Sequence, residues 1–263
     1  MVTGADCNRA VEEIKRSGVE HSLHLNLSEG TPLSPAESVP LLVNRNGEFA
    51  HSYPVLWLKA VLRKKFREQL KMEMDAQISR YRELFPAIEG MWLDSHQYFH
   101  LIPPVWDILM DFFRDGMPIS GVRVVNEPLL FLKSDWRYSL RYCFSLNMIK
   151  WFWLRLLSFR AVKKLEKLKQ TGRSPDYNRA FCGMLYSGNM RRELLTLLAR
   201  RCTGKPQYTA EVLFHPGGAS PDEIDIWKNQ PSYGKFYLSP FRRQELEELL
   251  KQEAALPPER PER

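Results

Sequence analysis

Short apolar segments alternate with longer runs of helix-forming residues along most of this chain. The apolar segments have the length and composition of buried strands, and they cover residues 21–27, 91–94, 121–125, 180–186 and 210–214. Because helical segments separate these strands, the pattern favours a parallel sheet or a barrel of βα units. With 263 residues and an apolar fraction of 44%, the chain is long enough for one such domain. We therefore predict the α/β class.

The remaining segments complete this prediction. Helices are expected at residues 5–15, 56–85, 105–114, 136–169 (as one helix or two), 190–201 and 242–251. Residues 28–53 are rich in Gly, Pro, Ser and Asn and predict a long loop, of a length that is often functional. The proline-rich residues 255–263 predict a disordered tail. Residues 1–254 are expected to form a single domain.

Polar side chains follow the predicted strands at the points where the strands end. His96, Glu127, Ser187 and His215 lie at or just after four different strands, and His24 lies on the polar face of a fifth. In parallel α/β folds the reactive groups gather at the C-terminal ends of the strands. The sequence therefore predicts an active site at this edge.

Several classes of protein are excluded by motifs that the sequence lacks. The four cysteines are scattered without a CxxC pair, which indicates a reduced, cytoplasmic chain with neither zinc knuckle nor disulfide framework. The first residues do not resemble a signal peptide, and no stretch of 18 apolar residues is free of charge. No nucleic-acid-binding module is visible, so we expect no nucleic-acid partner. GxSxG, P-loop and GxGxxG motifs are absent as well.

The formal net charge of +7 is concentrated in one segment. Residues 133–170 contain ten Lys and Arg against Asp135 and Glu166, a local excess of +8. Aromatic residues lie between these cations, which suits an interfacial helix at the inner membrane surface. A barrel helix with an aromatic inner face and a solvated basic outer face is the other interpretation, and both stay open.

Histidines and carboxylates of this chain predict a mixed divalent-metal site. Neutral imidazole suits transition metals, whereas carboxylate suits harder ions such as Mg²⁺. Asp94, His96 and His100 lie within one segment of seven residues, and His24 lies on a separate strand. A lone histidine is more often a hydrogen-bonded structural residue than a ligand. His24 and His96 considered together are the better candidates for metal ligands.

Three further residues are candidates for catalysis or substrate binding. His215 precedes a Pro-Gly-Gly turn, where an imidazole could protonate a departing amine; a turn histidine bonded to backbone is the alternative. Arg123 and Glu127 flank a predicted strand end. They are candidates either for holding a polar substrate or for a structural ion pair.

Three blocks of the sequence resemble the YdjC-like carbohydrate deacetylases, a group that includes chitooligosaccharide deacetylases and a hopanoid-biosynthesis-associated branch. The blocks are Leu23–Gly30 (LHLNLSEG), Leu93–Pro103 (LDSHQYFHLIP) and Phe214–Gly217 (FHPG). The Glu73-x-x-x-Gln77 spacing and Val122-Arg123 are also similar to the family. Gly183–Met190 (GMLYSGNM) is nearest to the hopanoid-associated branch.

The resemblance implies an irregular (β/α) barrel that holds a divalent ion, Mg²⁺ or Zn²⁺, and removes an N-acetyl group from an amino sugar or a glycolipid-linked sugar. His24 and His96 match the metal histidines of the family, and His215 matches a candidate general acid. Asp94 and His100 match positions that shape or orient the site, and we expect His100 to contact the substrate as well. For Asp94 the choice is between a general base and a partner that holds His96 in its tautomer, and we favour the second.

One family segment is not found in this chain. The family's first strand reads TADDFG and supplies the metal carboxylate, whereas this chain begins at a point that matches the sequence after the first βα unit. We therefore expect the barrel to lack its first strand–helix unit, and we expect codons upstream of Met1 to encode it. The alternatives are a catalytically inactive carbohydrate-binding protein of the same fold, or a membrane-surface protein acting through residues 133–170.

Overall fold

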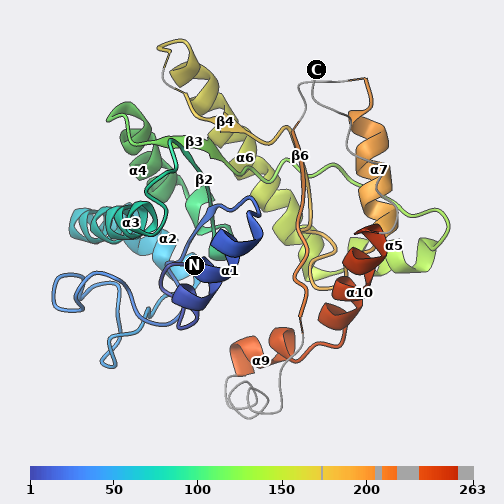
Figure 1. Cartoon of the computed structure of the whole chain (residues 1–263), viewed down its shortest axis with the longest axis horizontal. Coiled ribbons are helices and arrows are strands. Elements are labelled where there is room, and N and C mark those ends of the chain that lie inside the picture. Colours follow the sequence, from blue (N-terminus) through green and yellow to red (C-terminus); the bar gives the residue numbers. More distant parts are fainter. Residues whose placement is uncertain (173, 205–208, 218–230, 254–263) are drawn as a thin grey trace. The chain divides into compact units, whose positions relative to one another are not determined.

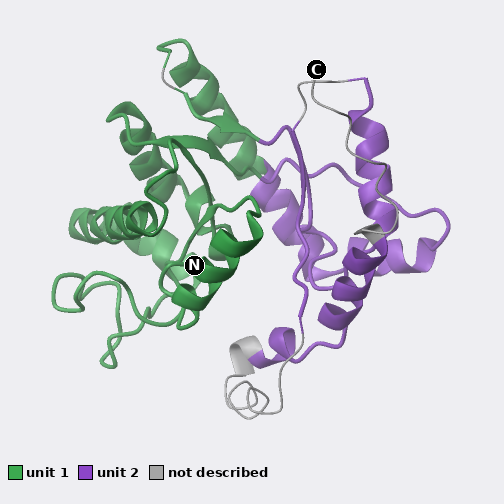
Figure 2. Cartoon of the chain, viewed as in Figure 1, with its two compact units in different colours: residues 1–124, 156–177 green, residues 125–155, 178–263 purple. Residues whose placement is uncertain are grey.

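The computed structural model describes residues 1–172, 174–204, 209–217 and 231–253, and Figure 1 shows their helices and strands. The chain divides into two compact units, drawn in different colours in Figure 2. Unit 1 comprises residues 1–124 and 156–177, and unit 2 comprises residues 125–155 together with the described part of 178–263. The predicted tail at 255–263 lies outside the described residues.

Unit 1 is a parallel sheet flanked by helices. Its four strands are hydrogen-bonded in the order β1-β2-β3-β4, and all three pairings are parallel. Helices α2, α3 and α4 pack against one another, and α3 contacts β1. The elements are α1 (Cys7–Ser17), β1 (Leu23–Leu25), α2 (Tyr53–Leu62), α3 (Lys64–Leu84), β2 (Met91–Ser95), the 3₁₀ helix η1 (His96–Leu101), α4 (Pro103–Arg114), β3 (Ile119–Val122) and β4 (Asp176–Tyr177). Parallel strands joined through helices confirm the predicted α/β class.

Unit 2 is built around a second, smaller core. Strands β5 and β6 pair in parallel, α7 packs on both of them, and α10 contacts α7. Buried side chains gather around Tyr186, which stacks on Tyr138 with their planes 8° apart. The elements are α5 (Trp136–Cys143), β5 (Ala180–Cys182), α7 (Arg192–Cys202), β6 (Ala210–Val212), α9 (Pro231–Tyr237) and α10 (Phe241–Glu253). Helix α6 (Leu146–Lys169) begins in unit 2 and ends in unit 1.

The strands form two separate sheets. Four belong to the β1–β4 sheet and two to the β5-β6 pair. Within the described parts of the chain these sheets are not hydrogen-bonded into a closed barrel. The parallel α/β arrangement is therefore established, and the barrel stays a prediction.

The single helix predicted at residues 56–85 is wrong. The structure divides it into α2 and α3 at Arg63, whose φ of −125° and ψ of 113° are extended. The guanidinium of Arg67 donates to the carbonyls of Ala60 and Val61, at 2.7 and 3.1 Å, and so satisfies acceptors that the end of α2 leaves open. Neither Gly nor Pro marks this break, so helix propensity alone could not locate it.

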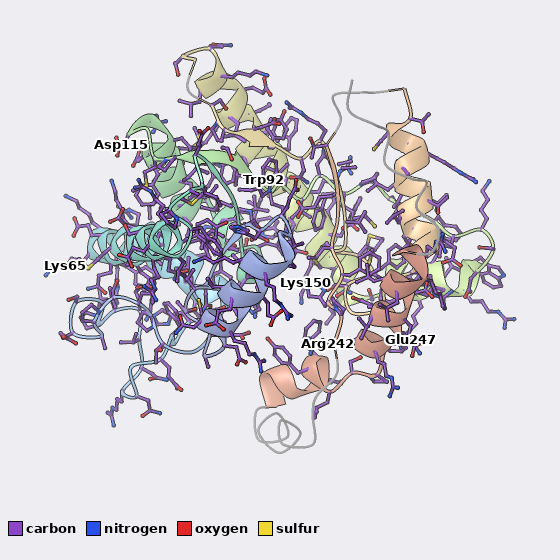
Figure 3. The ribbon with its side chains drawn as sticks, in the orientation of Figure 1. Lys65, Trp92, Asp115, Lys150, Arg242 and Glu247 are labelled. Carbon is purple, nitrogen blue, oxygen red and sulfur yellow. The ribbon has the colours of Figure 1, made fainter. Side chains whose placement is uncertain are left out.

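One glycine fixes how closely β2 and β3 approach. A Cβ atom at Gly121 would lie 1.9 Å from Cε3 of Trp92. The indole ring therefore occupies the space that a side chain at residue 121 would need. Trp92 is labelled in Figure 3. The register of β3 against β2, and with it the position of Arg123 beyond the strand end, depends on this contact.

Candidate active site at the ends of β1 and β2

The register of the first two strands brings His24 and Asp94 together. They are direct partners in the parallel pairing of β1 with β2. The Nδ1 atom of His24 donates to Oδ1 of Asp94 at 2.9 Å. This bond fixes the tautomer of His24 and leaves its Nε2 lone pair for a metal ion or a proton. The predicted partner of Asp94 was His96, so that expectation is corrected to His24.

Asp94 is almost fully buried, and its second oxygen is bound by a cation. Arg123, which follows β3, forms a buried ion pair with Oδ2 of Asp94. Burial by itself raises the pKa of Asp94, but the charges of His24 and Arg123 outweigh it and hold the pKa at about 2. Asp94 is therefore a permanent carboxylate at neutral pH, suited to orienting an imidazole and not to taking up protons.

His96 has its own carboxylate partner, which the sequence analysis did not identify. Its Nε2 atom lies 2.6 Å from Oε1 of Glu29. The side-chain oxygen of Asn26 accepts from the backbone N–H groups of Ser28 and Glu29, at 3.2 and 3.1 Å, and turns the chain just beyond β1. Glu29 lies inside the Leu23–Gly30 block, which was the available signal.

The two histidine rings lie close together with strained backbone beside them. Their centroids are 5.7 Å apart, edge to face. Directly after His96, Gln97 and Tyr98 have φ values of 50° and 60°, a left-handed conformation that side chains other than glycine disfavour. Such strain in consecutive residues is typical of functional sites, where the surrounding structure holds it in place.

Two buried side chains of α3 hold the end of β1 and the loop after it. Gln77 accepts from the N–H of Asn26 at 2.9 Å and donates to its carbonyl at 2.6 Å. Glu73 accepts from the N–H groups of Leu33 and Ser34, at 3.0 and 2.9 Å. These contacts replace the strand pairing that the alternating pattern of residues 21–27 predicted, so β1 ends at Leu25.

His100, predicted to contact substrate, is fully buried. Its Nε2 atom lies 2.9 Å from the carbonyl oxygen of Arg123, and its Nδ1 atom lies 2.6 Å from Oγ of Ser95. Because a carbonyl only accepts, Nε2 carries the proton and Nδ1 accepts from the serine. Burial lowers the pKa of His100 to about 4, so the ring is neutral. With both ring nitrogens engaged, His100 supports Arg123 and the end of β2.

Glu127, a further predicted substrate contact, lies in unit 2. Its carboxylate accepts from the consecutive backbone N–H groups of Gly183, Met184 and Leu185, at 2.9, 3.1 and 3.1 Å. Burial raises the pKa of Glu127 to about 7, against these hydrogen bonds, which lower it. Its contacts organise the turn after β5.

His215, the predicted general acid, also lies in unit 2, beyond β6. Its carbonyl accepts from Nε of Arg242 at 3.2 Å, and its backbone N–H donates to the buried Glu245. The ring stands edge-on to Phe236, with centroids 5.3 Å apart. Both the backbone N–H and the carbonyl of His215 are therefore held by side chains of α10.

The donor chemistry of unit 1 fits part of a metal site. His24 and His96 offer imidazole nitrogens, and Glu29 offers a carboxylate, which are the ligand types of Zn²⁺ sites. Among the residues that the structure describes, no group of three or more His, Cys, Asp or Glu is arranged to hold an ion. His24 and His96 therefore supply two candidate ligands, and within the described residues the set is incomplete.

Two histidine–carboxylate pairs lie at adjacent ends of parallel strands and define a candidate active site. A family model described as YdjC-like protein matches residues 1–256. The chain therefore belongs to the YdjC-like family, as its three blocks predicted.

Curated relatives carry names that agree with this membership. The chain is 30% identical over 139 residues to a mouse protein named carbohydrate deacetylase, and 30% identical over 140 residues to its human counterpart of the same name. It is 31% identical over 117 residues to a chitooligosaccharide deacetylase of Proteus mirabilis (strain HI4320). These matches cover 49%, 49% and 44% of this chain, but only 40%, 38% and 42% of the relatives.

Proposed function

We propose that this protein is a carbohydrate deacetylase, a hydrolase that removes the N-acetyl group from an amino sugar or a glycolipid-linked sugar. The observation that carries the proposal is the pairing of His24 with Asp94 and of His96 with Glu29, on rings 5.7 Å apart. Family membership and the names of the relatives support it.

Amide hydrolysis needs an activated water and an acid for the departing amine. His24 is suited to holding an ion that would activate the water, because the Asp94 bond at Nδ1 orients the ring and leaves the Nε2 lone pair as a ligand. Arg123 keeps Asp94 ionised throughout and therefore acts through it. Glu29 holds His96 at Nε2 and so leaves Nδ1 as the nitrogen available to an ion.

The proposed site includes a divalent ion, Zn²⁺ or Mg²⁺, bound by His24 and His96. When bound, such an ion polarises an amide carbonyl and makes water nucleophilic near neutral pH. Calorimetric titration with Zn²⁺ should show tight binding to the wild-type chain. The His24→Gln/His96→Gln variant should lose at least about 100-fold in Zn²⁺ affinity, because it removes groups that would bind the ion directly. Equal stoichiometry and affinity in both proteins would remove the metal from the proposal.

His215 is proposed as the acid that protonates the departing amine. The His215→Gln variant should lower kcat by roughly 10²–10⁴-fold at an unchanged melting temperature. A melting temperature that falls together with activity would instead assign His215 to the structure of its turn.

Acetate release from N-acetylated chitooligosaccharides tests the function itself. The wild-type chain should release acetate, and the His24→Gln/His96→Gln variant should not. The matched control is His51→Gln, because the ring of His51 bonds the carbonyl of Leu41 in the loop before α2. Oligosaccharide binding without acetate release, in a folded wild-type chain supplied with Zn²⁺, would favour the carbohydrate-binding alternative, which the incomplete ligand set also supports.

A further inference from the structure

Helix α6 is apolar on two opposite sides, and only one of them is covered. Leu154, Leu157, Ala161 and Leu165 are buried. The other side carries the α6 apolar face, defined here as Leu146, Ile149, Phe152, Leu156 and Phe159. Its residues are spaced by three, three, four and three positions, which places them along one side of a helix with 3.6 residues per turn.

The α6 apolar face is strongly exposed. Leu146, Ile149 and Phe152 keep 75%, 66% and 65% of their surface accessible, and Leu156 and Phe159 keep 50% and 58%. Two more large apolar side chains are exposed nearby along the chain, Phe144 at 87% and Trp136 at 53%. Isolated exposed apolar residues are ordinary, but a continuous row along one helix marks an interaction surface.

Cations continue the same row toward the end of the helix. From Leu156 the spacing of four, three and four leads to Arg160, Lys163 and Lys167, all of which are exposed. The ammonium of Lys163 lies 4.4 Å above the ring of Phe159. Lys150, labelled in Figure 3, is also exposed on α6. The helix thus combines a row of apolar side chains with Lys and Arg side chains. The long aliphatic part of a Lys or Arg side chain can lie on apolar surface while its charged group reaches water.

The helix is unsuited to crossing a bilayer. Among the described residues, none of the helices combines the length and hydropathy that a membrane span requires. A helix with an exposed apolar row and flanking cations instead lies in the plane of the interface, with its apolar side among the acyl chains and its cations beside anionic headgroups.

We propose that the α6 apolar face and its cations form a docking surface for an anionic membrane. The positive charge of this region favours an anionic partner. Residues 133–170 have an excess of eight positive charges, and Asp135 and Glu166 are their only acidic residues. Asp135 is already engaged by Arg191 at 2.9 Å. A second protein copy would have to place its own identical cations against these, whereas phosphatidylglycerol or phosphatidylserine headgroups neutralise them. This inference is independent of the proposed hydrolase activity.

Co-sedimentation of the full chain with vesicles tests the proposal. We expect binding to phosphatidylcholine vesicles that contain phosphatidylglycerol, weak binding to phosphatidylcholine alone, and release by high salt. The Arg160→Gln/Lys163→Gln variant should lose about 30-fold in partition coefficient, from about fivefold per cation near an anionic surface. The Ile149→Ser/Phe152→Ser variant should lose at least about tenfold.

Two control variants keep the same chemistry at other places. Leu246→Ser/Leu250→Ser removes exposed leucines from α10, a helix rich in glutamate, and Arg200→Gln/Arg201→Gln removes exposed cations from α7. Both should bind vesicles as the wild type does, and all four variants should keep the melting temperature of the wild type.

Three results would overturn the docking proposal. The first is equal binding to neutral and anionic vesicles, and the second is a loss in the control variants as large as in the α6 variants. The third is a dimer, detected by light scattering, that Ile149→Ser/Phe152→Ser dissociates, which would assign the face to a second copy of the chain. Acetate release from a soluble oligosaccharide, measured on the same variants, should be unchanged, so this proposal and the hydrolase proposal fail separately.

Discussion

Asp94 and Glu127 are two carboxylates of nearly equal burial, with 2% and 1% of their surfaces exposed. Asp94 lies in unit 1, where its partners are the side chains of His24 and Arg123, which outweigh its burial and hold its pKa at about 2. Glu127 lies in unit 2, where its partners are three backbone N–H groups, and burial raises its pKa to about 7. Burial alone therefore does not set the role of a carboxylate. Its partners do, and on that basis we propose a role in the reaction for Asp94 and a structural role for Glu127.

The largest expected difference between the two carboxylates is in activity. Asp94→Asn keeps the shape of the side chain but removes the charge that orients His24 and makes its imidazole a stronger ligand. We expect kcat/KM for acetate release to fall by roughly 10²-fold, the upper end of the range for losing a partner that holds a metal ligand. Glu127→Gln should change it by less than about threefold, since its carboxylate contacts Cys182 and the turn after β5, in unit 2. Equal losses in both variants would contradict the assignment of roles.

Substitution of Glu127 should affect the stability of the fold more than it affects activity. Glu127→Ala leaves the N–H groups of Gly183, Met184 and Leu185 without their buried acceptor, and we expect the free energy of unfolding to fall by about 3 kcal/mol or more. Glu127→Gln retains one acceptor oxygen and should cost about half as much. Urea denaturation at pH 7 measures both values. A cost below about 1 kcal/mol for Glu127→Ala would show that the turn does not depend on this carboxylate.

The opposite pKa directions predict opposite pH windows of stability. The folded state raises the pKa of Glu127 from 4.5 to about 7, so its contribution is complete below pH 4.5 and is lost as the pH rises to 7, by about 3 kcal/mol. The pKa of Asp94 falls from 3.8 to about 2, so its contribution is present above pH 3.8 and is lost as the pH falls toward 2, by about 2 kcal/mol.

Urea midpoints measured across this pH range separate the two windows. Glu127→Gln should flatten the stability curve between pH 4.5 and pH 7, and Asp94→Asn should flatten it only at acidic pH. Unchanged slopes in both variants would place these protonation events on other groups.

The smallest change in stability is expected at Ser95, which holds the buried His100 at the end of β2. Ser95 donates to Nδ1 of His100 and accepts from its backbone N–H. Ser95→Ala should lower the free energy of unfolding by about 1–2 kcal/mol, because both groups of His100 are buried. Ser79→Ala on the exposed side of α3 is the control and should be neutral. A larger loss in the control would show that the measurement reports helix α3 and not the site.

The sequence predicted β1, β2, β3, β5 and β6 but not β4. It also predicted that His24 and His96 lie together, because alternating apolar residues determine which strand face is buried. It did not predict the break at Arg63, which depends on a guanidinium that caps carbonyls of the preceding helix. Gln97 and Tyr98 were missed for a related reason, since their left-handed backbone runs against local preference.

Pairings between side chains were the least predictable part of the site. Glu29 has no periodic signal, and its contact with His96 depends on the turn that Asn26 makes beyond β1. The partner of Asp94 was misassigned because His96 is close in sequence, whereas the register of β1 against β2 places His24 beside it. Such contacts arise from the tertiary arrangement and leave no local pattern in the chain.

A double-mutant cycle on kcat/KM for acetate release tests most directly whether Asp94 acts through His24 as one catalytic unit. The proteins are the wild type, Asp94→Asn, His24→Gln and the double variant, all at pH 7. Groups that act as a unit give strongly non-additive losses, so the double variant should be no more than about threefold worse than His24→Gln alone. Losses that multiply would show that the two residues act independently and would contradict the account.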